Sequence, residues 1–83
     1  MTPVLVDTSA FYALADRSDA HHQEAMRIAS SMPEHGQSPF TTNYVLAETH
    51  VLILSRLGHQ AARRWLSSFA SKAISPGGTI RWN

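Results

Sequence analysis

The chain has 83 residues, enough for one small domain. Its composition, 43% hydrophobic and 16% charged, excludes a disordered chain and indicates an ordinary globular protein. A net charge of +1 is too small to indicate a nucleic-acid partner, and it does not exclude one.

The absence of cysteine excludes disulfide bonds and cysteine-based zinc sites. The first residues, Met1 to Val4, lack the basic start and long apolar run of a signal peptide. Apolar runs such as Val51 to Leu54 are far too short to cross a bilayer. We therefore expect a cytoplasmic protein with no membrane partner.

The first half of the chain predicts one strand and two helices. The apolar run 4–6, rich in β-branched residues, predicts a buried strand, and the chain turns at 7–9. Thr8 and Ser9 can cap a short buried helix over 10–15. After a turn at 16–19, Asp19 is placed to cap a second helix, which Pro33 ends before a loop at 34–39. The apolar stripe of that helix has the spacing i, i+3, i+4, i+7: Ala25, Ile28, Ala29 and Met32.

The second half predicts a strand and two more helices. Residues 40–41 form a brief strand, and Thr42 or Asn43 caps a helix over 44–57 that Gly58 terminates. A fourth helix follows over 59–72, then a turn at 75–78 and the start of a strand over 79–83. The apolar face of this fourth helix consists of Ala62, Trp65, Leu66, Phe69 and Ala73, and its polar face consists of Arg63, Arg64, Ser67, Ser68 and Ser71.

The order β-α-α-β-α-α predicts an α/β fold of short parallel strands with helical crossovers. Two short strands alone make a marginal sheet, so either further strands follow or a second copy of the chain completes it.

Asp7 directly follows the first strand and precedes a helix. In open α/β sheets, ligands bind outside the carboxyl ends of the strands, so Asp7 is a candidate ligand-binding residue. The plainer alternative is that Asp7 only caps the helix.

Glu48 has apolar or aromatic neighbours at i±3 and i±4: Tyr44, Val45, Val51 and Leu52. We expect the carboxylate to lie inside an apolar stripe, where a glutamate needs a partner or a metal ion. The alternative partner is an arginine or a hydroxyl group in the core.

A carboxylate pair at strand ends suits Mg²⁺ or Mn²⁺, which keep several waters and take their remaining ligands from phosphate groups. Such an ion can activate water and stabilise charge on a phosphodiester. Thr8, Ser9 and Asn43, together with Thr41 and Thr42, would supply polar groups nearby, although each alone is a common cap or turn residue.

The remaining polar residues have plainer interpretations. None of the five histidines has metal-ligand spacing with another, and adjacent His21 and His22 point about 100° apart on a helix. Arg63 and Arg64 could contact RNA phosphates, but a solvated helix face explains them as well.

Three segments together resemble a PIN domain, and within that family the VapC-type toxins: Val6 to Ala10, Asp16 to His22, and Thr41 to Glu48 with its helix ending at Gly58. The resemblance covers roughly residues 3–72. It implies a metal-dependent endoribonuclease, usually a homodimer, held inactive by a cognate antitoxin. Asp7 and Glu48 match the first two acidic positions of the family.

The chain departs from the family after Glu48, since no aspartate or glutamate follows, whereas PIN domains carry further aspartates in their second half. We therefore expect residues 1–73 to be the N-terminal part of a PIN-like domain, with an atypical tail at 74–83 and the C-terminal part missing. The alternative function is an inactive remnant that acts as a binding or oligomerising module. Half a sheet would also leave apolar surface exposed, so we expect self-association.

Overall fold

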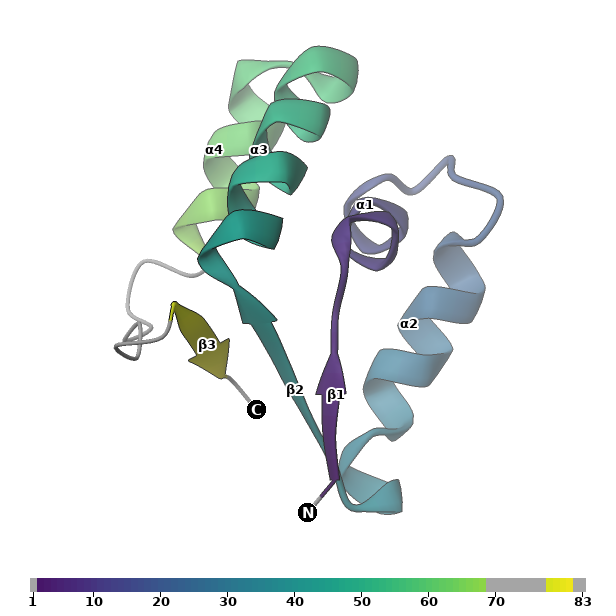
Figure 1. The fold of residues 1–83 in the computed structure, drawn as a ribbon. Helices are drawn as coiled ribbons and strands as arrows, with labels where there is room; N and C mark the ends of the chain where they lie inside the picture. Colours follow the sequence, from purple (N-terminus) through teal and green to yellow (C-terminus); the bar gives the residue numbers. More distant parts are fainter. Residues whose placement is uncertain (1, 69–77, 82–83) are drawn as a thin grey trace.

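A computed structural model of the chain describes residues 2–68 and 78–81. Within them, strands and helices alternate as the sequence predicts (Figure 1). The elements are β1 (Thr2–Leu5), α1 (Thr8–Ala15), α2 (His22–Ser31), the 3₁₀ helix η1 (Pro33–His35), β2 (Gln37–Thr42), α3 (Asn43–Leu57), α4 (His59–Ser67) and β3 (Thr79–Arg81).

The three strands form one sheet in the order β1-β2-β3. β1 and β2 are parallel, with Thr2 opposite Gln37 and Leu5 opposite Phe40. β3 is antiparallel to β2 and pairs Thr79 with Thr42. The α/β, PIN-like prediction is confirmed, and residues 79–81 of the expected atypical tail supply the third strand. The boundary predicted at residue 73 lies outside the described residues.

β2 is longer than predicted, because residues 37–39 join it instead of forming a loop. Thr2 N–H donates to the Gly36 carbonyl and Val6 N–H to the Phe40 carbonyl, each at 2.8 Å. Carbonyls 36 and 40 thus face β1, and alternation directs the Pro39 nitrogen to the other side of the strand. There the pairing with β3 begins only at Phe40, so the missing N–H of proline breaks no bond of that ladder.

The helix boundaries follow the predicted caps with small shifts. Thr42 caps α3, accepting from Val45 N–H at 3.2 Å, and Gly58 ends it with a φ of 92°. Helix α2 begins at His22, later than predicted, because Asp19 accepts from His21 N–H in the preceding turn. α4 is described to Ser67, and the predicted apolar residues Phe69 and Ala73 lie outside the described residues.

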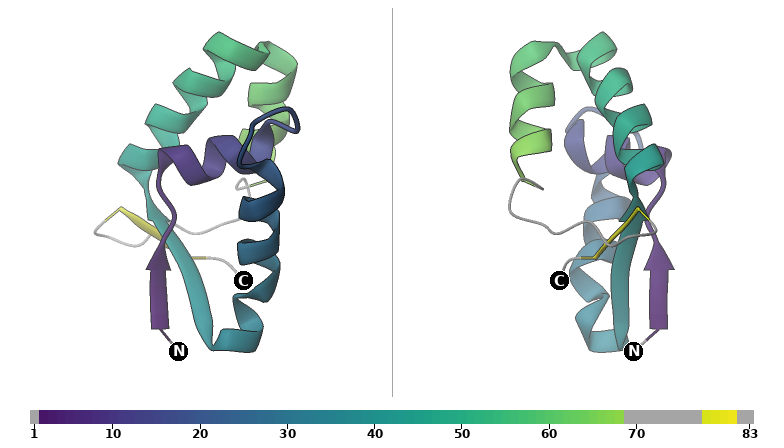
Figure 2. Two further views of the ribbon diagram at one scale, coloured as in Figure 1. Left: turned by 90° about the vertical axis from the view of Figure 1, so that its right-hand side faces the viewer. Right: turned by 60° about the vertical axis from the view of Figure 1, so that its left-hand side comes forward.

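α1 packs between α2 and α3, and α3 packs against α4 (Figures 1 and 2). Tyr12, Ile53 and Ala62, from α1, α3 and α4, form a buried cluster. Trp65 of α4 meets Phe11 edge-on, with ring centroids 5.5 Å apart and planes at 79°. The predicted core role of Trp65 is therefore confirmed.

Apolar surface remains exposed beside α2, which buries none of its own residues. Of its predicted stripe, Ile28 is 43% exposed, and only Met32, just after the helix, is buried. An apolar hollow of about 730 Å³ lies between β1, α1 and α2, with Val4, Leu5, Ile28 and Met32 in its wall. The structure thus has the exposed apolar surface that we expected, and self-association stays a prediction. Across the described segments, no helix is long and apolar enough to cross a membrane.

Candidate metal centre

Asp7 caps α1 and also keeps a free carboxylate oxygen. Its Oδ1 accepts hydrogen bonds from Ala10 N–H at 3.1 Å and from the Ser9 hydroxyl at 3.0 Å. The plainer prediction, helix capping, is confirmed, but neither Thr8 nor Ser9 is the cap. Within the part of the chain that the structure describes, Oδ2 accepts no hydrogen bond, and the residue is exposed. Asp7 can therefore cap the helix with one oxygen and offer the other to a ligand.

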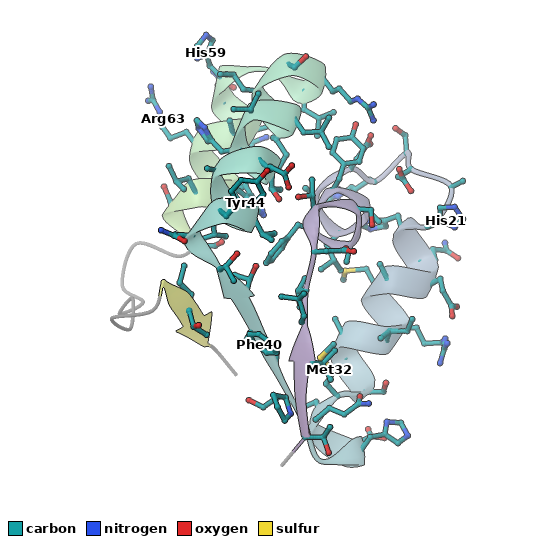
Figure 3. The ribbon with its side chains drawn as sticks, in the orientation of Figure 1. His21, Met32, Phe40, Tyr44, His59 and Arg63 are labelled. Carbon is teal, nitrogen blue, oxygen red and sulfur yellow. The ribbon has the colours of Figure 1, made fainter. Side chains whose placement is uncertain are left out.

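Glu48 is exposed, and the prediction that it lies inside an apolar stripe is wrong. Its neighbours Tyr44 and Val51 are 70% and 64% exposed, because α3 turns its opposite face, with Thr49 and Ile53, toward the fold. Tyr44 lies on the first turn of α3 (Figure 3). Tyr44 and Val51 therefore belong to the surface, while Leu52 packs against the core cluster, and the exposed Glu48 carboxylate needs no buried partner.

A hydrogen bond from Thr8 links α3 to the end of β1. Its hydroxyl donates to Glu48 Oε1 at 3.0 Å, across 40 positions of the sequence. Since Thr8 directly follows Asp7, this bond brings Glu48 of α3 to the carboxyl end of β1. The expected convergence of α3 and the first strand end is thus found, with the predicted polar residue Thr8 at its centre.

The donor set fits a hard divalent cation. It offers carboxylate oxygens from two elements at an exposed edge, with the hydroxyls of Thr8 and Ser9 beside them. In residues 2–68 and 78–81, no group of three or more His, Asp or Glu side chains is arranged to hold a metal ion. Two carboxylates with water and phosphate oxygens as further ligands is a set that Mg²⁺ accepts, whereas a structural zinc site needs four protein ligands.

Asn43 also lies at this edge of the sheet, but its contacts are with the tail strand. Its backbone N–H donates to the Gly78 carbonyl at 2.8 Å, and its side-chain amide lies against the Gly78 Cα. Thr41 is fully buried and donates to the Val6 carbonyl at 2.9 Å. Of the predicted polar group, Thr8 and Ser9 bond to the carboxylates, while Thr41 and Thr42 have structural roles.

Gly78→Ala is expected to destabilise the protein by about 1–2 kcal/mol. Gly78 has a φ of 80°, and an added Cβ would lie 2.7 Å from Asn43 Oδ1, so the Asn43 amide would have to rotate away. Thermal unfolding of the variant measures the loss. In an Asn43→Ala background, the part due to the clash should disappear and only the backbone strain should remain. An equal loss in both backgrounds would show that Asn43 takes no part.

Arg63 and Arg64 are exposed and lie away from the carboxylate pair. Arg63 points outward from α4 (Figure 3). Arg64 lines a second hollow at the far end of α1 from Asp7, together with Arg17 and His22. Arg63 is exposed, as the solvated-face interpretation expects, while Arg64 lines a concave surface that the sequence did not predict.

The sequence also did not predict the hydrogen bond between Tyr12 and Asp16, at the end of α1 away from Asp7. The Tyr12 hydroxyl donates to Asp16 Oδ2 at 2.7 Å, and the Arg56 guanidinium lies 5.2 Å from the centroid of the Tyr12 ring. Ser18 donates its N–H and hydroxyl to Asp16 Oδ1. Tyr12 and Asp16 are four residues apart around a helix end, and that spacing was the available signal.

These bonds make part of the stability depend on pH. The Tyr12 hydroxyl, and after it Ser18, lower the pKa of Asp16 below its ordinary 3.8, while the bond to Asp16 raises the pKa of Tyr12. Because the folded carboxyl has the lower pKa, its contribution is complete above the unfolded value and is lost as pH falls through the folded one. Melting temperatures of wild type and Tyr12→Phe should thus differ near neutral pH and converge in acid. A constant difference would contradict this.

Comparison with known proteins identifies the family, although no protein-family model matches the chain. The chain belongs to the VapC-type PIN family, as its fold and two similarities show. The 23S rRNA-specific endonuclease VapC20 of Mycobacterium tuberculosis, from strains CDC 1551 and H37Rv, is 42% identical over 59 residues. The match covers 71% of this chain and 43% of VapC20, so the chain spans less than half of these curated relatives.

A solved structure shares the fold. The crystal structure of Mycobacterium tuberculosis VapC20, described as a Sarcin-Ricin loop cleaving toxin, matches with a TM-score of 0.71 and 37% identity. The match covers 81% of this chain and 49% of that one. The family resemblance inferred from the sequence motifs is confirmed.

Proposed function

We propose that Asp7 and Glu48 hold a divalent cation, Mg²⁺ or Mn²⁺, in an endoribonuclease of the VapC type. The observation that supports this most directly is the Thr8–Glu48 hydrogen bond, which joins the glutamate of α3 to the residue directly after the strand-end aspartate. The similarity to an rRNA-specific endonuclease gives the proposal its substrate class. RNA is the substrate, and the 23S rRNA of the relative is the first to test.

The residues of the chain would have separate tasks in hydrolysis. Asp7 and Glu48 would hold the ion, while Thr8 and Ser9 orient the two carboxylates through their hydroxyl groups. When bound, the ion supplies charge stabilisation on the phosphodiester and lowers the pKa of water. Asn43 and Arg64 of α4 would contact the substrate outside this centre. As in the family generally, a cognate antitoxin, a homodimer and a cytoplasmic location belong to the proposal.

A second candidate, an inactive module that binds or self-associates, is favoured by one observation. Among the described residues, no group of three or more His, Asp or Glu side chains could hold a metal ion. The exposed apolar hollow beside α2 is the surface such a module would use.

One experiment separates the two candidates. The purified chain is incubated with 23S rRNA in Mg²⁺, in Mn²⁺ and in EDTA, and the products are mapped by primer extension. Cleavage that needs the metal and stops in Glu48→Gln supports the enzyme. A chain that never cuts RNA but sediments as a stable dimer or higher oligomer would favour the module.

A further inference from the structure

A hollow of about 820 Å³ lies between the end of α1, the start of α2 and the α3–α4 hairpin. Its apolar wall includes Leu14, Met26 and Leu57. The positively charged side chains around it come from two distant parts of the sequence, Arg17 after α1 and Arg64 on α4. The folded chain therefore brings two like charges from distant parts of the sequence to one concave surface.

One carboxylate lines the hollow, that of Asp16, and because it is ionised at neutral pH it offsets one of the two arginine charges. Both of its oxygens already accept hydrogen bonds from Tyr12 and Ser18. Within the described residues the one salt bridge joins Arg27 to Glu24, so Arg17 and Arg64 have no ion-pair partner there. Their guanidinium groups remain available to an external anion.

His22 is the third basic group of the hollow. Its Nδ1 lies 2.6 Å from the Ala13 carbonyl. Because a carbonyl only accepts, Nδ1 carries the proton and the imidazole is held in one orientation against the end of α1. The ring therefore forms a fixed side of the hollow that Arg17 and Arg64 also line.

We propose that this hollow binds a backbone phosphate of the RNA, an inference that rests on the proposed function. Arginine is suited to the task because its planar fork matches two phosphate oxygens. The hollow lies at the opposite end of α1 from Asp7, and eight helical residues span about 12 Å. That is about three or four nucleotides of a stacked strand, so one RNA strand can reach both places.

Arg63 and Arg64 provide a matched pair for the test. Adjacent residues on a helix point about 100° apart, and only Arg64 lines the hollow. Both are exposed on α4, so Arg63→Ala and Arg64→Ala remove the same charge from the same helix turn. Arg64→Lys keeps the charge and controls for loss of the side chain.

The experiment measures binding of a fluorescein-labelled single-stranded RNA in EDTA over a series of KCl concentrations. For single strands, each lost phosphate contact reduces the slope of log K against log salt by about 0.7. Arg17→Ala and Arg64→Ala should each reduce it by about that amount, while Arg63→Ala and Arg64→Lys should leave it near the wild-type value.

The outcomes distinguish the two proposals. Equal slopes for Arg63→Ala and Arg64→Ala, with RNA still bound, would overturn the phosphate site and leave the ribonuclease proposal standing. A wild-type chain that binds no RNA in EDTA would overturn the phosphate site alone, because the proposed metal centre cannot bind its cation under these conditions.

Discussion

Asp7→Asn is expected to reduce RNA cleavage at least about 100-fold while leaving the fold nearly as stable as the wild type. Changes to groups that merely support metal ligands already cost up to about that factor, so loss of a direct ligand should cost no less. Asparagine caps helices as well as aspartate does, because its side-chain oxygen can still accept from Ala10 N–H. Cleavage rates in Mg²⁺ and thermal unfolding of the same preparations measure the two effects.

Asp7→Ala is the matched comparison. It removes both the charge and the cap, so it should lose cleavage equally and about 1 kcal/mol of stability in addition. An Asp7→Asn chain that cuts RNA at the wild-type rate would show that Asp7 is a cap and nothing more.

Ile80→Ala is expected to destabilise the protein by about 2–5 kcal/mol, a large share of the stability of a small domain. Ile80 is 1% exposed although it lies in a strand of three residues near the end of the chain. Removing its side chain would leave a cavity where β3 pairs with β2. Urea unfolding measures the change in the free energy of unfolding.

Ile28→Ala is the control, since it makes the same substitution at a side chain that is 43% exposed. It should cost much less. Equal effects of the two substitutions would mean that β3 contributes no more to the fold than an exposed helix surface does.

The sequence predicted the fold where local signals and the global arrangement agree. Thr42 and Gly58 mark the ends of α3 because a hydroxyl cap and a left-handed backbone are properties of single residues. The parallel pairing of the first two strands follows from the helices between them. The antiparallel strand β3 was only suggested, since pairing between distant segments leaves no periodic signal in three residues.

The approach of Glu48 to the end of the first strand was predicted, but partly for the wrong reason. Apolar neighbours at helical spacing led us to expect a buried Glu48, whereas Tyr44 and Val51 are exposed beside it. Helical spacing shows which residues share a face and cannot show which face meets the rest of the fold. The Thr8–Glu48 hydrogen bond and the hollow lined by Arg17 and Arg64 join residues that are far apart in the sequence, so no local sequence pattern predicts them.

The central claim, that Asp7 and Glu48 together hold a divalent cation, is tested most directly by titration with Mn²⁺. Electron paramagnetic resonance would follow free Mn²⁺ in wild type, Asp7→Asn and Glu48→Gln, with Glu34→Gln as a control for an exposed carboxylate elsewhere. We predict saturable binding by wild type and Glu34→Gln, and at least about tenfold weaker binding by each of the other two. Equal Mn²⁺ binding by all four proteins would contradict the claim.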